Sequence, residues 1–168
     1  MSSTQAAIDA YLAAGRAVAE RHVAGSRRLD PAPWRALGYT VHRDARRGPE
    51  AHVDDVLIAQ ALNAARVSRA PRRTLVLATG DGNGNGGRAS YPQVVEAALD
   101  RGWAVEVVAW RFKLHRAYGR LAARRPGDCA VRLLDDAVPP PPRSWAEEIG
   151  PRLDAKGEVA RPPTPEPQ

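Results

Sequence analysis

Apolar positions along the chain follow two periods, and their order predicts strands that alternate with helices. Short apolar and β-branched runs predict strands, while apolar residues recurring every three or four positions predict helices. The predicted strands cover residues 22–25, 39–42, 74–79, 104–110 and 130–134. The predicted helices cover residues 5–21, 53–66, 91–100 and 113–124, and a capped helical turn covers residues 30–34. This alternation predicts an α/β domain with one parallel sheet covered on both faces.

Proline separates the C-terminal part of the chain from this pattern. Residues 139–142 are four consecutive prolines, and residues 161–168 hold four more. Such segments cannot join a sheet or a helix interior and favour an extended or disordered chain. We therefore expect a domain over residues 1–137, with 43% apolar composition in the whole chain to supply its core, and a Pro-rich linker and disordered tail over residues 138–168.

Residues 74–91 carry the strongest candidate for a functional site. A strand that the pattern predicts to be buried ends in Gly80-Asp81, and a loop of alternating glycine and asparagine leads to a helix that Ser90 begins. In an open α/β sheet, ligands bind at the carboxyl ends of the strands. Asp81 is therefore the residue on which other functional side chains are expected to converge, while Ser90 and Gln93 predict a capping box.

A second acidic group lies at the start of the helix predicted from residue 53. Glu50, Asp54 and Asp55 have the spacing and the hard oxygen atoms that suit a divalent cation. The alternative is that Asp54 only caps the helix. Asp81 favours the interpretation as a cation site, because it adds a further carboxylate. Several carboxylates in one crevice repel each other unless a metal neutralises them.

The glycine-rich loop also fits a dinucleotide fingerprint. Gly82, Gly84 and Gly87 match G-x-G-x-x-G between a strand and a helix, and Arg111 follows the next strand. Asp81 argues against this interpretation, because it would face a pyrophosphate with the wrong sign of charge. The polar loop residues Asn83, Asn85 and Arg88 are the better candidates to contact a ligand.

Charge and composition favour an anionic partner. The net charge is +6, the pI is near 10.2, and arginine supplies nearly all of the positive charge. Arg116, Arg120 and Arg124 are four apart and form one helix stripe. Basic residues Arg111, Lys113 and His115 precede it, and aromatic residues Trp110, Phe112 and Tyr118 are interleaved. This pattern suits RNA phosphates and unpaired bases; the alternative is a solvated face beside core aromatics.

The cysteine content and the hydropathy of the chain restrict the cellular compartment that we expect. Cys129 is the only cysteine, so an internal disulfide and a cysteine zinc site are excluded, and no apolar run reaches the ~18–20 residues of a membrane span. We expect an intracellular protein, cytoplasmic or nuclear, with no membrane partner.

Three motifs in order resemble the NYN domain family, which are PIN-like nucleases related to LabA-like proteins. The motifs are Glu50-x-x-Val53-Asp54-Asp55, the run ending Thr79-Gly80-Asp81-Gly82-Asn83, and Tyr91-Pro92 through Gly102-Trp103 to Glu106. The resemblance implies a three-layer α/β/α Rossmann-like sheet and an acidic, Mg²⁺-binding cleft that cleaves RNA. It implies that Glu50, Asp54 and Asp81 are the acids, and that Asn83 stands where many members have a second Asp.

The chain departs from the family pattern at its front. The family begins with a strand in the middle of the sheet that ends in an acid, whereas the first residues here resemble the helix that follows that strand. We expect a domain that is N-terminally incomplete, or a member that has lost its first ligand and is inactive.

These observations together predict a metal-dependent RNA phosphodiester hydrolase. Glu50, Asp54 and Asp81 are expected to hold Mg²⁺ or Mn²⁺, with Asn83 assisting. The residues expected to bind RNA are Arg88, Arg111, Lys113, Arg116 and Arg120. The alternatives are a non-catalytic RNA-binding or scaffold module and a dinucleotide-binding protein.

Overall fold

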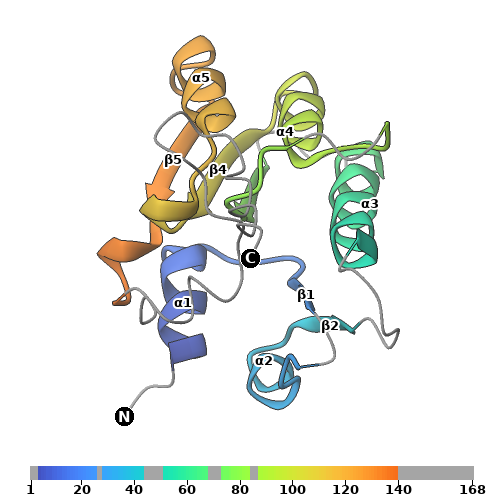
Figure 1. Ribbon diagram of the computed structural model, residues 1–168, viewed down its shortest axis with the longest axis vertical. Helices are drawn as coiled ribbons and strands as arrows, with labels where there is room; N and C mark the ends of the chain where they lie inside the picture. The colour runs from blue at the N-terminus through green and yellow to red at the C-terminus, as the bar shows by residue number, and fades with distance from the viewer. Residues whose placement is uncertain (1–3, 26–27, 44–50, 68–72, 84–86, 140–168) are drawn as a thin grey trace, which may run out of the picture. The chain divides into compact units, whose positions relative to one another are not determined.

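A computed structural model of the chain describes residues 4–25, 28–43, 51–67, 73–83 and 87–139 (Figure 1). The chain divides into a unit over Pro139–Gln168 and a unit over Met1–Val138, which holds the described helices and strands. Its helices are α1 (Thr4–Ala13), α2 (Ala32–Ala36), α3 (Ala51–Val67), α4 (Tyr91–Leu99) and α5 (Arg116–Arg124), with 3-10 turns η1 (Arg111–Lys113) and η2 (Leu134–Asp136). Its strands are β1 (His22–Gly25), β2 (Thr40–Arg43), β3 (Thr74–Ala78), β4 (Ala104–Ala109) and β5 (Cys129–Leu133).

The strands pair in parallel, as the alternating pattern predicts, but they form two sheets. β1 pairs with β2, and β3, β4 and β5 form a second sheet in that order. In the second sheet Leu77 lies opposite Val107, and Val107 lies opposite Val131. The α/β class with parallel pairing is therefore confirmed, while the prediction of one continuous sheet is wrong. Among the described residues, β1 and β3 each have a strand on one side only.

β3 is less buried than its apolar sequence predicts. Leu77 is buried, whereas Thr74 and Ala78 are exposed and the residues between are half-buried. β4 has neighbours on both sides and buries Val105, Val107, Val108 and Ala109. The difference follows from the pairing, because an edge strand is shielded by a neighbour on one side only.

Side chains of β4 contact helices on both faces of its sheet. Val105 and Val107 belong to the main core with residues of α3, α4 and α5, including Ile58, Val94, Val95, Tyr118 and Leu121. Val108 belongs to a second cluster with Leu134 and Val138, packed against Ala7, Ile8, Tyr11 and Leu12 of α1. Successive strand residues point to opposite faces, so β4 is the strand around which the described core is built.

α1 ends eight residues earlier than predicted. It ends at Ala13, and Ala14 and Gly15 have φ of 48° and 73°. Arg16 then folds back on the helix, where its guanidinium donates to the carbonyls of Leu12 (3.1 Å) and Ala13 (3.0 Å). The same guanidinium bonds both carboxylate oxygens of Glu106 on β4 at 2.5 and 2.8 Å. The local turn thus fixes the helix end to the sheet.

Glu106 joins α1 to two strands. Besides Arg16, it accepts a bond of 2.8 Å from Arg132 on β5, whose guanidinium lies 4.1 Å from the Tyr11 ring centroid. The bond from Arg16 is the largest cause that lowers the pKa of Glu106, with the Arg132 bond adding to it. A lowered carboxyl pKa means stability that is present above the unfolded pKa, near 4.5, and is lost as pH falls through the folded value.

We expect Glu106→Gln to lower the free energy of unfolding at pH 7 by about 1–2 kcal/mol. This is below the loss for a fully buried pair because these side chains are partly exposed. Urea unfolding at pH 7 and pH 3 measures it, and the difference from wild type should shrink at pH 3. The matched control is Glu96→Gln, whose pair with Arg124 is exposed and should change stability by less than about 0.5 kcal/mol. Equal effects of both substitutions would contradict this account.

Two histidines link β1 and β2. The rings of His22 and His42 are stacked with centroids 5.5 Å apart, and His22 Nδ1 lies 3.2 Å from His42 Nε2. One of these nitrogens must accept the hydrogen bond, so protonating both rings removes it. Burial is the main cause that lowers the pKa of His42, and the charge of His22 lowers it further.

The β1–β2 pair is therefore expected to lose stability in mild acid. With a folded pKa below the ordinary value of about 6.5, neutral His42 contributes stability above that pH that is lost as pH falls. The free energy of unfolding, measured at pH 7.5 and at pH 5.5, should fall less between these two pH values for His42→Asn than for wild type. Parallel pH profiles of the two proteins would show that the stacked pair has no such effect.

Candidate acidic site

Two acidic residues from separate elements lie beside two buried tyrosines. Asp54 lies in the first turn of α3, and Asp81 follows β3. The Tyr91 hydroxyl, at the start of α4, donates to Asp54 Oδ1 at 2.8 Å. The Tyr118 hydroxyl, on α5, donates to the main-chain oxygen of Asp81. Three helices and one strand thus position the pair.

The charge of Asp81 acts on Asp54 and on both tyrosines. Burial is the largest cause that raises the pKa of Asp54, the charges of Asp81 and Asp55 raise it further, and the Tyr91 hydrogen bond acts in the opposite direction. Burial likewise raises the pKa of Tyr91 and of Tyr118, and both acids add to each effect. The tyrosines therefore remain neutral donors at neutral pH, and a cation near Asp54 and Asp81 would relieve their repulsion.

The segment that carries Asp81 is held by its own turns. Asp81 N donates to Thr79 Oγ1 at 3.2 Å, and Asp81 Oδ1 accepts from Asn83 N at 2.9 Å. The second bond is an Asx turn, which aspartate forms readily at a strand end. Asp81 and Asn83 are exposed, so their side chains face solvent beside the half-buried Asp54.

The start of α5 packs closely against the same segment. His115 N donates to Gly80 O at 3.1 Å. A Cβ at Gly80 would overlap the main chain of Lys113, and a Cβ at Gly82 would overlap the His115 ring. His115 Nδ1 also accepts from Ala117 N at 3.2 Å and so caps α5. These glycines are required for contact between chain segments, a role that the glycine count alone does not reveal.

The carboxylate pair suits a hard cation. Mg²⁺ is commonly held by one or two carboxylates, with waters and substrate phosphates completing its shell. Asp54, Asp81 and the side-chain oxygen of Asn83 provide that chemistry. Across the described ranges, no group of three or more His, Cys, Asp or Glu side chains is arranged to hold a metal. Glu50, the third predicted ligand, lies outside the described residues.

Asp54 is not a helix cap. α3 begins at Ala51, so Asp54 lies inside its first turn and bonds Tyr91 instead. The capping alternative for this residue is therefore wrong. The prediction for Ser90 is confirmed, since Ser90 N donates to Gln93 Oε1 at 2.8 Å as part of a capping box.

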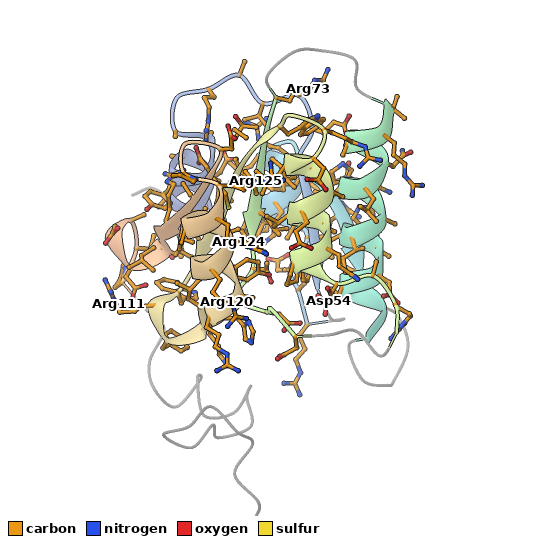
Figure 2. The ribbon with its side chains drawn as sticks, turned by 90° about the horizontal axis from the view of Figure 1, so that it is seen from above. Asp54, Arg73, Arg111, Arg120, Arg124 and Arg125 are labelled. Carbon is orange, nitrogen blue, oxygen red and sulfur yellow. The ribbon has the colours of Figure 1, made fainter. Side chains whose placement is uncertain are left out.

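The predicted cationic residues lie in three places. Arg88 Nη1 bonds Asp55 Oδ2 at 2.5 Å, which ties the loop to α3 next to Asp54. Arg111 and Lys113 are exposed in η1, and Arg116 and Arg120 are exposed on α5. Figure 2 shows Asp54, Arg111 and Arg120 toward one end of the molecule and Arg73, just before β3, toward the other. This placement puts Arg111 and Arg120 at the same end as Asp54.

The basic segment differs from its prediction in two respects. The expected continuous helix over residues 113–124 is η1 followed by α5, because Leu114 and His115 are extended. Arg124, the third member of the arginine stripe, pairs with Glu96 at 3.0 Å. The stripe's contribution to an anion-binding surface therefore rests on Arg116 and Arg120.

The aromatic residues also separate into different roles. Tyr118 is fully buried, and Trp110 is half-buried against the cluster of Val108. Neither can serve as the open stacking surface that the sequence suggested, whereas Phe112 is exposed. The sequence pattern alone does not reveal the roles of Tyr91 and Tyr118 as hydrogen-bond donors beside the acids. The available signal for Tyr91 is its position directly after Ser90, the N-cap of α4.

The surroundings of Gly82 argue against the dinucleotide-binding alternative. The fingerprint needs a glycine that lets a pyrophosphate approach the main chain, whereas the His115 ring covers Gly82. Residues 84–86, which include Asn85, lie outside the described residues.

Comparison with known proteins found no matching family model, curated protein or solved structure. Within the described residues, no helix is both long enough and apolar enough to cross a membrane.

Proposed function

We propose that this chain is a metal-dependent RNA phosphodiester hydrolase in which Asp54 and Asp81 hold Mg²⁺ or Mn²⁺. The observation that carries the proposal is that Asp54, in α3, lies close enough to Asp81, after β3, for the charge of Asp81 to raise its pKa. Tyr91 donates to the Asp54 carboxylate, and Tyr118 donates to the main-chain oxygen of Asp81. The exposed cations of η1 and α5 add a surface that attracts a polyanion.

The proposal extends to a PIN-like three-layer arrangement. β1 and β3 each have an unpaired side among the described residues. α1 supports this arrangement because it bonds one sheet and the residues that precede the strands of the other. Tyr11 donates to Leu133 O of β5 at 2.8 Å, and Asp9 accepts bonds from Arg21 (3.1 Å) and Tyr39 (3.0 Å), which directly precede β1 and β2. The family that the motifs resemble has a further central strand, and the open sides of β1 and β3 are where such a strand would pair.

The residues of the site divide the work of phosphodiester hydrolysis. A bound cation supplies stabilisation of charge on the phosphoryl oxygens and a lower pKa for water. Tyr91 holds the Asp54 carboxylate in one orientation, and the Asx turn holds that of Asp81. Asn83 and Glu50 are the proposed additional oxygen ligands, and Arg111, Lys113, Arg116 and Arg120 orient the RNA backbone through its phosphates.

The test is cleavage of a labelled single-stranded RNA by the purified protein with Mn²⁺. Wild type should cleave, EDTA should stop the reaction, and Asp81→Asn should slow it by at least about 100-fold, since several kcal/mol of charge stabilisation are lost. Asp136→Asn is the matched control, because Asp136 is an exposed acid in η2. Wild-type cleavage no faster than that of Asp81→Asn would overturn the catalytic proposal.

A second candidate is a non-catalytic RNA-binding module. The same exposed cations favour this function. In addition, no group of three or more His, Cys, Asp or Glu side chains among the described residues could hold a metal ion. This function predicts RNA binding that weakens with salt and with Arg116→Ala and Arg120→Ala, yet is indifferent to EDTA. EDTA-insensitive binding without Mn²⁺-dependent cleavage would favour it over the hydrolase.

A further inference from the structure

Phe112 is an exposed aromatic ring between two cations. Of the described residues, the exposed large apolar side chains are Phe112, at 48% of its surface, and Val67, at 72%. The Phe112 ring is stacked with Trp110 at a centroid distance of 6.4 Å and an interplanar angle of 24°. Lys113 Nζ lies 6.0 Å from the Phe112 centroid, and Arg111 precedes it. An exposed ring thus held is a ready stacking surface.

The ring is fixed relative to the acidic site. η1, which contains Phe112, packs on Gly80, where no Cβ could be accommodated beside Lys113. Arg111 N donates to Asp135 Oδ2 at 2.8 Å, so the other end of η1 is held by η2. Asp81 directly follows Gly80, and β3 and β4 are adjacent strands whose carboxyl ends carry Asp81 and η1. Phe112 and Asp81 therefore lie just past the carboxyl ends of neighbouring strands of one sheet.

We propose that Phe112 stacks on an unpaired base of a single-stranded RNA and thereby sets the preference of the site for single strands. This inference rests on the proposed function and names its specificity-determining residue. Every base offers a π-face to an aromatic side chain, so such stacking is tolerant of sequence. A base inside a duplex is already stacked on both faces and cannot reach the ring. Arg111 and Lys113 bind the phosphates on either side of the stacked nucleotide.

The proposal is tested by binding, separately from cleavage. A short single-stranded RNA containing 2-aminopurine is titrated with protein in EDTA, and the fluorescence quench and the Kd are measured. Wild type should quench the probe. Phe112→Leu, which keeps an apolar side chain without a π-face, should weaken binding about tenfold and reduce the quench. Phe112→Trp should retain both, and Val67→Ala should match wild type, because Val67 is an exposed apolar residue at the end of α3 and does not belong to η1.

A matched experiment uses fully duplex RNA, for which Phe112→Leu should bind as wild type does. Equal single-strand affinity and quench for Phe112→Leu and wild type would overturn the stacking proposal, as would a failure of wild type to bind the probe. A third outcome is that wild type quenches the probe, Phe112→Leu does not, and neither protein cleaves RNA in Mn²⁺. This outcome would support the stacking role and reject the hydrolase. The two proposals therefore fail separately.

Discussion

Asp54→Asn is expected to lower Mn²⁺-dependent RNA cleavage by at least about 100-fold while leaving the fold as stable as wild type or more stable. The two effects have one cause. Burial and the charges of Asp81 and Asp55 raise the pKa of Asp54. For an acid whose pKa is raised on folding, the stabilising contribution is present below the unfolded pKa and is lost as pH rises through the folded pKa. At pH 7 the ionised carboxylate therefore opposes folding, and asparagine removes that cost.

The asparagine preserves the surrounding contacts. Its side-chain oxygen can still accept the bond that Tyr91 donates to Asp54 Oδ1. Single-turnover cleavage measures the activity, and urea unfolding at pH 7 measures the stability of the same preparation. Asp136→Asn is the control and should change neither by much. If Asp54→Asn loses activity and stability together, the carboxylate is a structural group rather than a cation ligand.

Gly80→Ala is expected to destabilise the protein by about 1–3 kcal/mol, the usual range for overpacking. A Cβ at this position overlaps main-chain atoms of Lys113, which cannot rotate away as a side-chain tip would. The substitution should therefore separate η1 from the end of β3. It should also weaken single-stranded RNA binding, because Phe112 and Asp81 depend on that contact for their relative position.

Gly119→Ala provides the matched control for that experiment. Gly119 lies inside α5, and a Cβ there meets nothing within 4 Å. Alanine in a helix interior is favoured over glycine, so this variant should gain about 0.5–1 kcal/mol. Thermal or urea unfolding of both variants measures the contrast. Destabilisation of similar size in both would mean that the close approach at Gly80 is not the cause.

The strands and most helices could be predicted because their signals are local. The apolar run of β4 and the capping box at Ser90 each depend on residues within a few positions. α1 ends at a turn in which Ala14 and Gly15 have positive φ, and Arg16 then bonds Glu106, ninety positions away in the sequence. The apolar periodicity of residues 5–21 continues past this turn, so it predicts a helix that is too long.

The sequence predicted the positions of the acidic residues better than the contacts that hold them. The local patterns placed Asp81 at a strand end and Asp54 near a helix start, although β2, which precedes α3, and β3 belong to separate sheets. The tyrosine donors depend on how α4 and α5 pack, and the sequence pattern treated Tyr118 as a surface aromatic although it is fully buried. The split of the strands into two sheets was missed because hydrophobic periodicity does not report which strand edges pair.

Mn²⁺ binding followed by electron paramagnetic resonance tests the central claim most directly, because it asks whether Asp54 and Asp81 form a cation site without requiring an RNA substrate. Free Mn²⁺ gives the signal that is lost on binding, so a titration yields the affinity and the number of sites. Wild type and Asp136→Asn should bind one Mn²⁺ alike, and the double variant Asp54→Asn with Asp81→Asn should lose it. Equal Mn²⁺ binding by wild type and the double variant, or none by either, would contradict the account.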